Sequence, residues 1–171
     1  MTNLNGSSKD PTKLLVLCGL FAALITVGTL ISIPRAGGHG YINLGDAFIH
    51  AAAFVIGGWH CAAVAAVGSA IADLILGYGI YVPGTVIIKA LTAFVCFLLL
   101  RKLRFKPLAC IISGLIVPLG YLAYELMLSA FGAFEAHVAF FDLTWNMIQY
   151  AVCAVIGIIA VSLIDRIPYE R

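Results

Sequence analysis

Long apolar stretches recur along almost the whole of this chain. Most run for roughly 17–25 residues, about the length that an α-helix needs to cross the hydrocarbon core of a bilayer. The chain is 63% hydrophobic and only 11% charged over 171 residues, which is far outside the range of soluble domains. The pattern predicts an all-α integral membrane protein. Because the net charge is only +2 and no basic run with interleaved aromatics occurs, we expect no nucleic-acid partner.

Six spans can be assigned, with boundaries good to a few residues. The predicted spans cover residues 13–33, 44–57, 60–77, 84–100, 108–131 and 143–164. The second span is short and rich in alanine, which is typical of a helix packed among other helices. The chain is therefore expected to have a tail (1–12), a six-helix membrane domain (13–165) and a second tail (166–171).

The basic residues predict the orientation of these spans. They gather before the first span, between the fourth and fifth, and after the sixth: Lys9, Lys13, Arg101, Lys102, Arg104, Lys106, Arg166 and Arg171. With six spans, these regions share one face, which the positive-inside rule makes cytoplasmic. The opposite face has only Arg35 in its loops, together with Glu135 and Asp142. We expect both tails inside and a first span that is retained, because it is too long for a signal peptide.

Several polar side chains interrupt the apolar spans, and all of them fall in the same outer half of the membrane. They are Asp46, Asp73, Lys89, Glu125, Asn146 and Gln149. At about 1.5 Å of rise per residue, each lies within roughly 10 Å of the outer boundary. A proton relay or an ion channel would need polar groups through the full depth. The alignment predicts a compact bundle with a solute pocket open to the outside.

Structural roles compete with binding roles at each of these positions. Asn43 and Asp46 stand where N-cap and first-turn acids belong. Asp73 and Lys89 can form an ion pair between the third and fourth helices. Glu125 has no basic partner nearby in sequence, which makes it the strongest candidate for a binding role.

The sixth span and two aromatic residues carry similar alternatives. Asn146, Gln149 and Tyr150 share one helical face by their spacing, either as pocket lining or as polar contacts between helices. Tyr41 and Trp145 can stack on a ligand or belong to the aromatic belt at the membrane surface.

Residues 34–41 form a glycine-rich outer connection that can act as a mobile lid over such a pocket. No Gly-x-x-x-x-Gly-Lys-Ser/Thr run occurs, so we expect no ATPase in this chain. The scattered cysteines and histidines lack metal-binding spacings, although Asp46 and His50 stand one helical turn apart. We therefore expect no metal site and no cofactor.

The first span carries small residues at helical spacing: Gly19, Ala22 and Ala23. Small residues spaced in this way let another helix approach closely in lipid. The neighbouring helix can belong to the same bundle or to another membrane subunit.

Local motifs resemble those of one family. Residues 19–23 look like an AxxxA segment with Gly for the first Ala, and residues 40–47 are similar to a G-x-I-N-L-G-D-A stretch. Ala72-Asp73-Leu74, Gly77-Tyr78, Tyr81-x-Pro83, Ile88-Lys89 and Asn146-x-x-Gln149 fit in the same order. Together with six spans in fewer than 200 residues, these motifs resemble the S components of energy-coupling factor (ECF) vitamin transporters. The resembling branch includes riboflavin-labelled members and members linked to hydroxymethylpyrimidine or pyridoxine.

The resemblance implies a division of labour. An S component captures one vitamin outside and docks through the small-residue face of its first helix on a transmembrane coupling subunit, which two cytoplasmic ATPases drive. It implies a multi-pass protein of a bacterial plasma membrane. The expected substrate-binding residues are Tyr41, Asn43, Asp46, Asp73, Tyr81, Lys89, Glu125, Trp145, Asn146 and Gln149.

Affinity arithmetic favours a small ring as the substrate. Nanomolar capture needs about 12 kcal/mol of binding free energy. A ring compound of about a dozen heavy atoms then needs about 1 kcal/mol per atom, near the ceiling for small ligands, so the site must be enclosed. The excess of acids favours a neutral or cationic heterocycle, with pyridoxine or hydroxymethylpyrimidine first and riboflavin next. A small integral-membrane enzyme and a stand-alone secondary transporter remain as alternatives.

Overall fold

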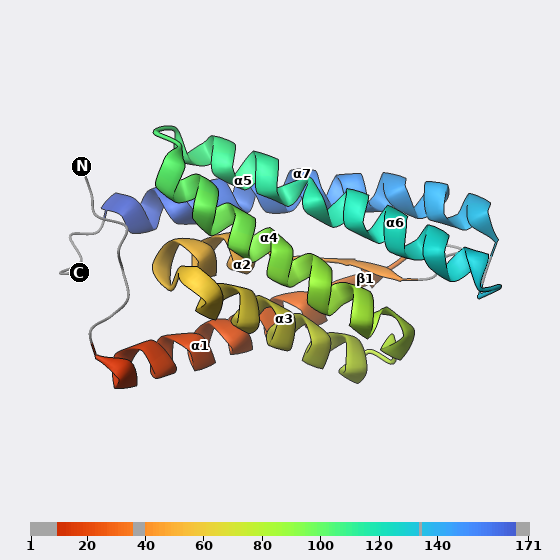
Figure 1. Cartoon of the computed structure of the whole chain (residues 1–171), viewed down its shortest axis with the longest axis horizontal. Coiled ribbons are helices and arrows are strands. Elements are labelled where there is room, and N and C mark those ends of the chain that lie inside the picture. The colour runs from red at the N-terminus through yellow and green to blue at the C-terminus, as the bar shows by residue number, and fades with distance from the viewer. Residues whose placement is uncertain (1–9, 36–39, 134, 167–171) are drawn as a thin grey trace.

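The computed structural model describes residues 10–35, 40–133 and 135–166 and is almost entirely helical (Figure 1). In chain order the elements are α1 (Pro11–Leu30), β1 (Ser32–Pro34), β2 (Tyr41–Asn43), α2 (Gly45–Val55), α3 (Gly58–Ile75), the 3₁₀ turn η1 (Gly79–Tyr81), α4 (Val82–Lys102), α5 (Lys106–Gly114), α6 (Ile116–Ala130) and α7 (Ala136–Arg166). The all-α membrane fold predicted from hydropathy is confirmed. The predicted division into tails and membrane domain stays a prediction, since residues 1–9 and 167–171 lie outside the described residues.

Five segments of the described chain are long and apolar enough to cross a membrane. They are Pro11–Leu30, Gly58–Ile75, Gly79–Lys102, Lys106–Ala130 and Ala136–Arg166. The second predicted span is the exception, because α2 has only 11 residues. At 1.5 Å per residue it is about 16 Å long, roughly half of the hydrocarbon thickness. Helix α2 therefore reaches only part of the way through the bundle.

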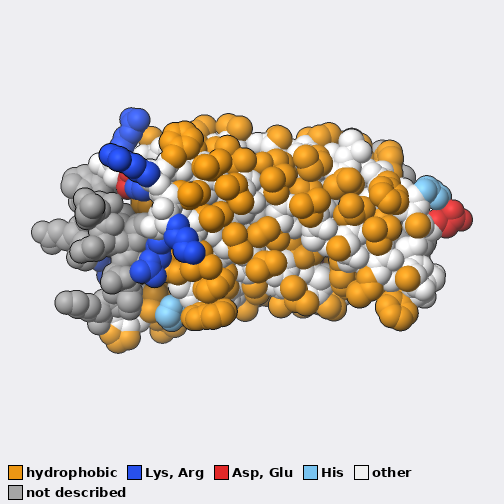
Figure 2. Space-filling model, turned by 45° about the horizontal axis from the view of Figure 1, so that its top comes forward, with side chains coloured by type: hydrophobic (Ala, Val, Ile, Leu, Met, Phe, Trp, Pro, Cys, Tyr) orange, Lys and Arg blue, Asp and Glu red, His pale blue; other side chains and the backbone are white. Residues whose placement is uncertain are grey.

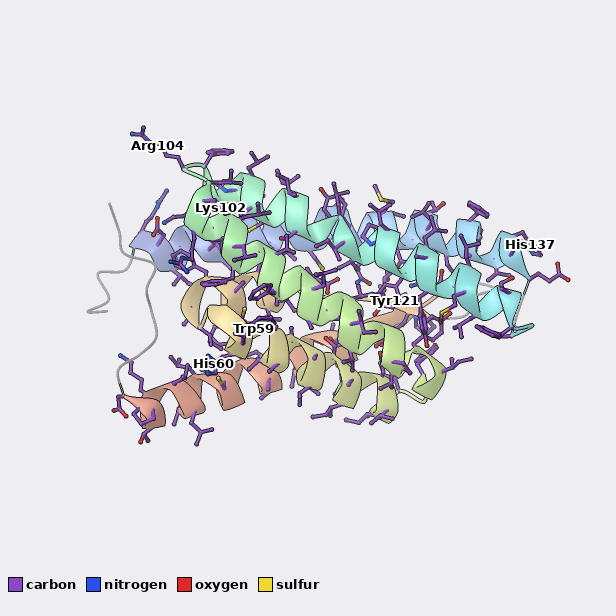
Figure 3. The ribbon with its side chains drawn as sticks, viewed as in Figure 1. Trp59, His60, Lys102, Arg104, Tyr121 and His137 are labelled. Atoms are coloured by element: carbon purple, nitrogen blue, oxygen red, sulfur yellow. The ribbon has the colours of Figure 1, made fainter. Side chains whose placement is uncertain are left out.

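The two ends of the molecule differ in charge. The start of α1, the α4–α5 turn and the end of α7 lie together at one end in Figure 1. Lys102 and Arg104 lie at this end and His137 at the other, as Figure 3 shows. Figure 2 shows hydrophobic side chains covering the surface between the ends, with Lys and Arg gathered at the first. We call the first the basic end and, from the orientation predicted above, the second the outer end.

The connection between α1 and α2 differs from the prediction. The first span was expected to reach residue 33, but α1 ends at Leu30 and Ser32–Pro34 form a strand. This strand pairs antiparallel with Tyr41–Asn43, with Ile33 opposite Ile42. Proline has no amide hydrogen and disfavours a helical conformation in the residue before it, so a helix is hard to extend into Pro34. Residues 36–39 of the expected lid, which include its histidine and two of its three glycines, lie outside the described residues.

The fifth predicted span is broken into two helices. Helix α5 ends at Gly114 and α6 starts at Ile116. Pro118 lacks the amide hydrogen that would bond to the Gly114 carbonyl, and its ring crowds that carbonyl. The break lies one turn before the proline, as this mechanism predicts.

Close helix contacts rest on small residues in α1 and α3. The Thr26 hydroxyl of α1 lies 2.9 Å from both the Ala22 carbonyl and the Gly68 carbonyl of α3. A Cβ on Gly68 would lie 2.8 Å from the Ala22 carbonyl oxygen. Ala22 therefore packs against a helix of the same bundle, which is one of the two neighbours considered for the small residues of the first span. Gly19 and Ala23 are exposed.

The interior is divided into an apolar part and a polar part. A continuous apolar cluster includes Phe21, Ile25, Phe54, Cys96 and Val161. The buried charged side chains instead gather toward the outer end of the bundle. Cys61, Cys96, Cys110 and Cys153 are buried, and all five cysteines are free thiols. This division leaves a polar site enclosed by apolar helices.

Candidate functional site

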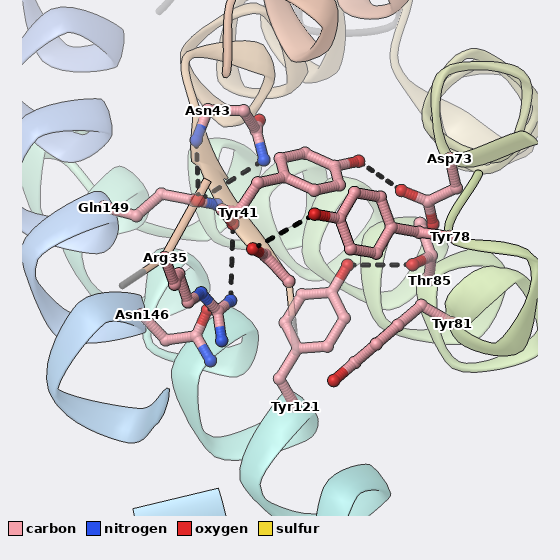
Figure 4. Close-up of a pocket in the computed structure, with 11 residues that line it drawn as sticks. Arg35, Tyr41, Asn43, Asp73, Tyr78, Tyr81, Thr85, Tyr121, Asn146 and Gln149 are labelled. Atoms are coloured by element: carbon pink, nitrogen blue, oxygen red, sulfur yellow. Dashed lines mark hydrogen bonds between the residues drawn. The ribbon is translucent and has the colours of Figure 1, made fainter. Parts of the chain in front are cut away.

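A cavity lies between the β1–β2 hairpin and the outer parts of α3, α4, α6 and α7 (Figure 4). It contains about 300 Å³ of empty space, including its open mouth. Its lining residues are Arg35, Gly40, Tyr41, Asn43, Asp73, Tyr78, Tyr81, Thr85, Tyr121, Asn146 and Gln149. Polar hydrogen-bonding groups and aromatic rings therefore share one small enclosure.

Four tyrosines form an aromatic wall of this cavity. The ring centroids of Tyr41 and Tyr78 are 4.9 Å apart, and those of Tyr78 and Tyr81 are 6.3 Å apart. Tyr121 follows at 6.4 Å from Tyr81, and its hydroxyl lies 2.9 Å from that of Thr85. Rings at these separations attract one another and present flat faces and edges to a planar ligand. The wall combines this surface with hydroxyl groups.

A network of polar groups ties β2, α2, α4 and α7 together beside the cavity. Lys89 forms an ion pair with Asp46, with 2.5 Å between Nζ and Oδ1. The Gln149 amide donates to the other oxygen of Asp46 at 2.6 Å, and its own oxygen accepts from the backbone N–H of Asn43 at 2.9 Å. The predicted pair between Asp73 and Lys89 is wrong, because Asp46 at the start of α2 is the partner of Lys89.

The hydrogen-bond partners of Asp73 among the described residues are hydroxyl groups. The Tyr41 hydroxyl donates to its Oδ1 atom, and the Thr85 hydroxyl also lies near the carboxylate. Burial, together with the neighbouring Asp73, raises the pKa of Tyr41, so this hydroxyl stays protonated and able to donate. The second oxygen, Oδ2, is buried and has no hydrogen-bond partner among the described residues.

Arg35 is the centre of a third cluster. Its guanidinium group forms ion pairs with Glu125 at 3.6 Å and with Asp142 at 3.2 Å. It also donates to the Asn146 side-chain oxygen at 2.9 Å and to the Tyr41 carbonyl at 3.3 Å. The cluster ties the end of the β1–β2 hairpin to α6 and α7.

One expectation about these charges is wrong, and one residue gains a distant partner. Glu125 has no basic partner nearby in sequence, but Arg35, 90 residues earlier in the chain, pairs with it. Asp142 was placed in an outer loop, but α7 begins at Ala136 and holds Asp142 fully buried. A helix longer than the predicted span carries this carboxylate into the bundle.

The predicted site residues divide into three groups. Six of them line the cavity: Tyr41, Asn43, Asp73, Tyr81, Asn146 and Gln149. Asp46, Lys89 and Glu125 are buried in the networks behind the lining. Trp145 is half-buried against the edge of Phe141, with ring centroids 6.5 Å apart, and is not part of the lining. Tyr150 turns toward α5, where its hydroxyl donates to the Ile111 carbonyl at 3.2 Å.

Sequence reasoning missed several residues that lie one helical turn from a predicted one. Thr85 precedes Lys89 by four positions, Tyr121 precedes Glu125 and Asp142 precedes Asn146. Residues four apart share a helix face. Counting four positions toward the N-terminus from each predicted residue would therefore have found them. Arg35 left a different signal, since it is the single basic residue in the outer loops and faces several outer acids.

No group of three or more His, Cys, Asp or Glu side chains gathers as a metal site within residues 10–35, 40–133 and 135–166. His39 lies outside these ranges. His50 packs against Gly157, where a Cβ would lie 2.5 Å from Nδ1. The residues that line the cavity offer hydrogen bonding, ion pairing and ring stacking.

Comparison with known families gives one match that spans almost the whole chain. Residues 9–166 match the family described as the S component of the ECF-type riboflavin transporter. No curated protein matches the chain.

Proposed function

The chain belongs to the ECF-type riboflavin transporter S component family, and from this premise we propose that it captures a single-ring, water-soluble vitamin or vitamin precursor in the cavity at its outer end. Members of this family are membrane-embedded transport components rather than enzymes. The observation that carries the proposal is the cavity, lined by four tyrosines and by other polar side chains from three helices and a hairpin.

The size of the cavity favours pyridoxine or hydroxymethylpyrimidine. The space of about 300 Å³ includes open solvent at the mouth, so the closed part of the cavity is smaller still. A ring compound of about a dozen heavy atoms needs the least widening of the walls and meets the demand for nearly complete burial. Riboflavin, with three fused rings and a polyhydroxylated chain, is the alternative that the description of the family favours.

The proposed transport cycle needs partner subunits. The chain has no nucleotide-binding Gly-x-x-x-x-Gly-Lys-Ser/Thr run, so two ATPases and a transmembrane coupling subunit would supply the energy and the pathway. Gly19 and Ala23 support docking through α1, because both are exposed and no atom lies within 4 Å of a Cβ built on Gly19. We place the protein in the plasma membrane of a bacterium, with the basic end in the cytoplasm.

Binding to the purified protein tests this function. The solitary protein in detergent is titrated with pyridoxine, hydroxymethylpyrimidine, thiamine and riboflavin by calorimetry, without ATP. We expect one-to-one binding of a single-ring compound, since capture does not need the partner subunits. Tight binding of riboflavin would select the alternative ligand and would require the cavity to open. A folded protein that binds none of the four would contradict the proposal.

A further inference from the structure

Four carboxylates and two cations are buried in the described part of the bundle. The carboxylates are Asp46, Asp73, Glu125 and Asp142, and the cations are Arg35 and Lys89. Three of the carboxylates pair with a cation: Lys89 with Asp46, and Arg35 with Glu125 and Asp142. Among the described residues, Asp73 alone of the four has no cation within 4.0 Å, which sets it apart chemically.

The position of Asp73 makes the lack of a nearby cation relevant to ligand binding. It lines the cavity and is only 3% exposed, so water screens it poorly. A buried carboxylate is costly unless it is paired and hydrogen-bonded. The Tyr41 hydroxyl serves one oxygen, and Oδ2 has no hydrogen-bond partner among the described residues. Glu125 and Asp142 also have oxygens without hydrogen-bond partners among the described residues, but neither residue lines the cavity. Asp73 is therefore the buried carboxylate that a positively charged group of a ligand would meet.

The aromatic wall restricts what can bring that charge. Tyr41 and Tyr78 lie beside Asp73 in Figure 4, while Arg35 lies on the opposite side of the tyrosine rings. A flat ring placed among these tyrosines would direct one edge toward the carboxylate and the other toward the guanidinium group. The edge that faces Asp73 should therefore carry the positive charge.

We propose that Asp73 is the counter-ion of a protonated ring nitrogen in the captured vitamin, which restricts the substrate to basic nitrogen heterocycles such as pyridines and pyrimidines. This inference rests on the proposed function, because it specifies the ligand of the same cavity. It also distinguishes the two ligand classes, since the ring system of riboflavin carries no basic nitrogen that is protonated at neutral pH. Hydrogen bonds to charged groups are stronger than those between neutral groups. The pairing would therefore add affinity as well as select ligands with a protonated ring nitrogen.

A substitution at Asp73 tests the pairing. The probe is pyridoxine or hydroxymethylpyrimidine, whichever binds in the titration above, together with its analogue in which a ring nitrogen is replaced by C–H. The Asp73→Asn variant keeps an oxygen that accepts from Tyr41 but loses the charge. We expect it to bind the vitamin about 10- to 100-fold more weakly and to bind the analogue within about threefold of the wild type. Glu135→Gln removes an exposed carboxylate near the outer end and is the matched control, with both affinities unchanged.

The outcomes separate this inference from the proposed function. Equal losses for vitamin and analogue would show that Asp73 acts only by holding Tyr41, and would overturn the inference while the capture function stands. A wild-type protein that binds neither single-ring vitamin contradicts the proposed function itself.

A spectroscopic measurement on the wild type needs no variant. It can therefore test whether the bound ring is protonated even if Asp73→Asn does not fold. The ultraviolet absorption of these heterocycles differs between the protonated and unprotonated ring. At a pH just above the ring pKa of the free vitamin, the bound vitamin should keep the spectrum of the protonated ring. A bound spectrum of the unprotonated ring would overturn the inference.

Discussion

Lys89 Nζ lies 2.5 Å from Asp46 Oδ1, and this ion pair joins α4 to the first turn of α2. Both side chains are at most 4% exposed, and Gln149 of α7 donates to the second oxygen of Asp46. The Lys89 ammonium group also lies 5.3 Å from the centre of the Tyr121 ring, which lines the cavity. The network therefore links the stability of the bundle to the geometry of the site.

Replacing Lys89 with Met should destabilise the protein strongly. The change leaves the Asp46 carboxylate buried beside a neutral side chain, and removal of one partner from a buried pair costs about 3–5 kcal/mol. Thermal unfolding in detergent measures the loss. The double variant Asp46→Asn/Lys89→Met should recover part of it, because no unpaired charge remains. A double variant as unstable as the sum of both single variants would contradict a direct pairing.

Glu125→Gln should weaken vitamin binding without unfolding the protein. Glu125 does not line the cavity, so we expect it to act through Arg35, at a cost of about 1 kcal/mol or roughly fivefold in affinity. Calorimetry on the wild type, Glu125→Gln, Arg35→Lys and the double variant measures the coupling. In the Arg35→Lys background, Glu125→Gln should have little further effect, because lysine cannot reproduce the planar fork of contacts. Strictly additive losses would show that Glu125 acts independently of Arg35.

Gly157→Ala should destabilise the bundle by about 1–3 kcal/mol through overpacking. A Cβ at this position would lie 2.5 Å from His50 Nδ1, and His50 is fully buried and held by its neighbours. The matched control is Gly19→Ala on α1, where nothing lies within 4 Å of the added Cβ. This control should stabilise the helix by about 0.5–1 kcal/mol. Similar melting temperatures for the two variants would contradict the close packing at Gly157.

Gly19→Leu should abolish transport while leaving vitamin binding intact. The added side chain projects from α1 into the space that a partner helix would occupy in the proposed complex. Co-purification with the coupling subunit and uptake into vesicles measure docking, and calorimetry measures capture. Ala151→Leu places the same side chain on an exposed position of α7, away from α1 in Figure 1, and should leave both unchanged. Normal uptake by Gly19→Leu would move the docking surface elsewhere.

Local patterns were sufficient for much of the fold and part of the site. Hydropathy located every long helix, since each apolar stretch must be buried in lipid or protein whatever its neighbours are. Six of the ten proposed ligand-binding residues line the cavity. Three of these, Asp73, Asn146 and Gln149, lie on long helices, where depth can be counted along one segment at a time. The break between α5 and α6 could also be expected, because Pro118 removes a backbone hydrogen bond by its own chemistry.

Which buried acid pairs with which buried base across the bundle could not be predicted in the same way. Helix depth places Asp46, Asp73 and Lys89 at one level, but not the rotation of each helix that decides which pair meets. The contact of Arg35 with Glu125 and Asp142 depends on a hairpin that folds back between helices, and hydropathy does not register that connection. Trp145 shows the same limit, because a rotation of α7 turns it away from the cavity and its neighbour Asn146 toward it.

The sequence by itself determined the membrane class and the level at which polar groups gather, and its basic loops predict the orientation. These properties follow from free energies of transfer, which add up along the chain residue by residue. Only the tertiary structure decided that Lys89 pairs with Asp46, that Arg35 pairs with both Glu125 and Asp142, and that Asp73 lines the cavity with no cation within 4.0 Å among the described residues. Ion pairing depends on distances of a few ångströms between segments far apart in sequence, and those distances exist only when all of the helices are packed together.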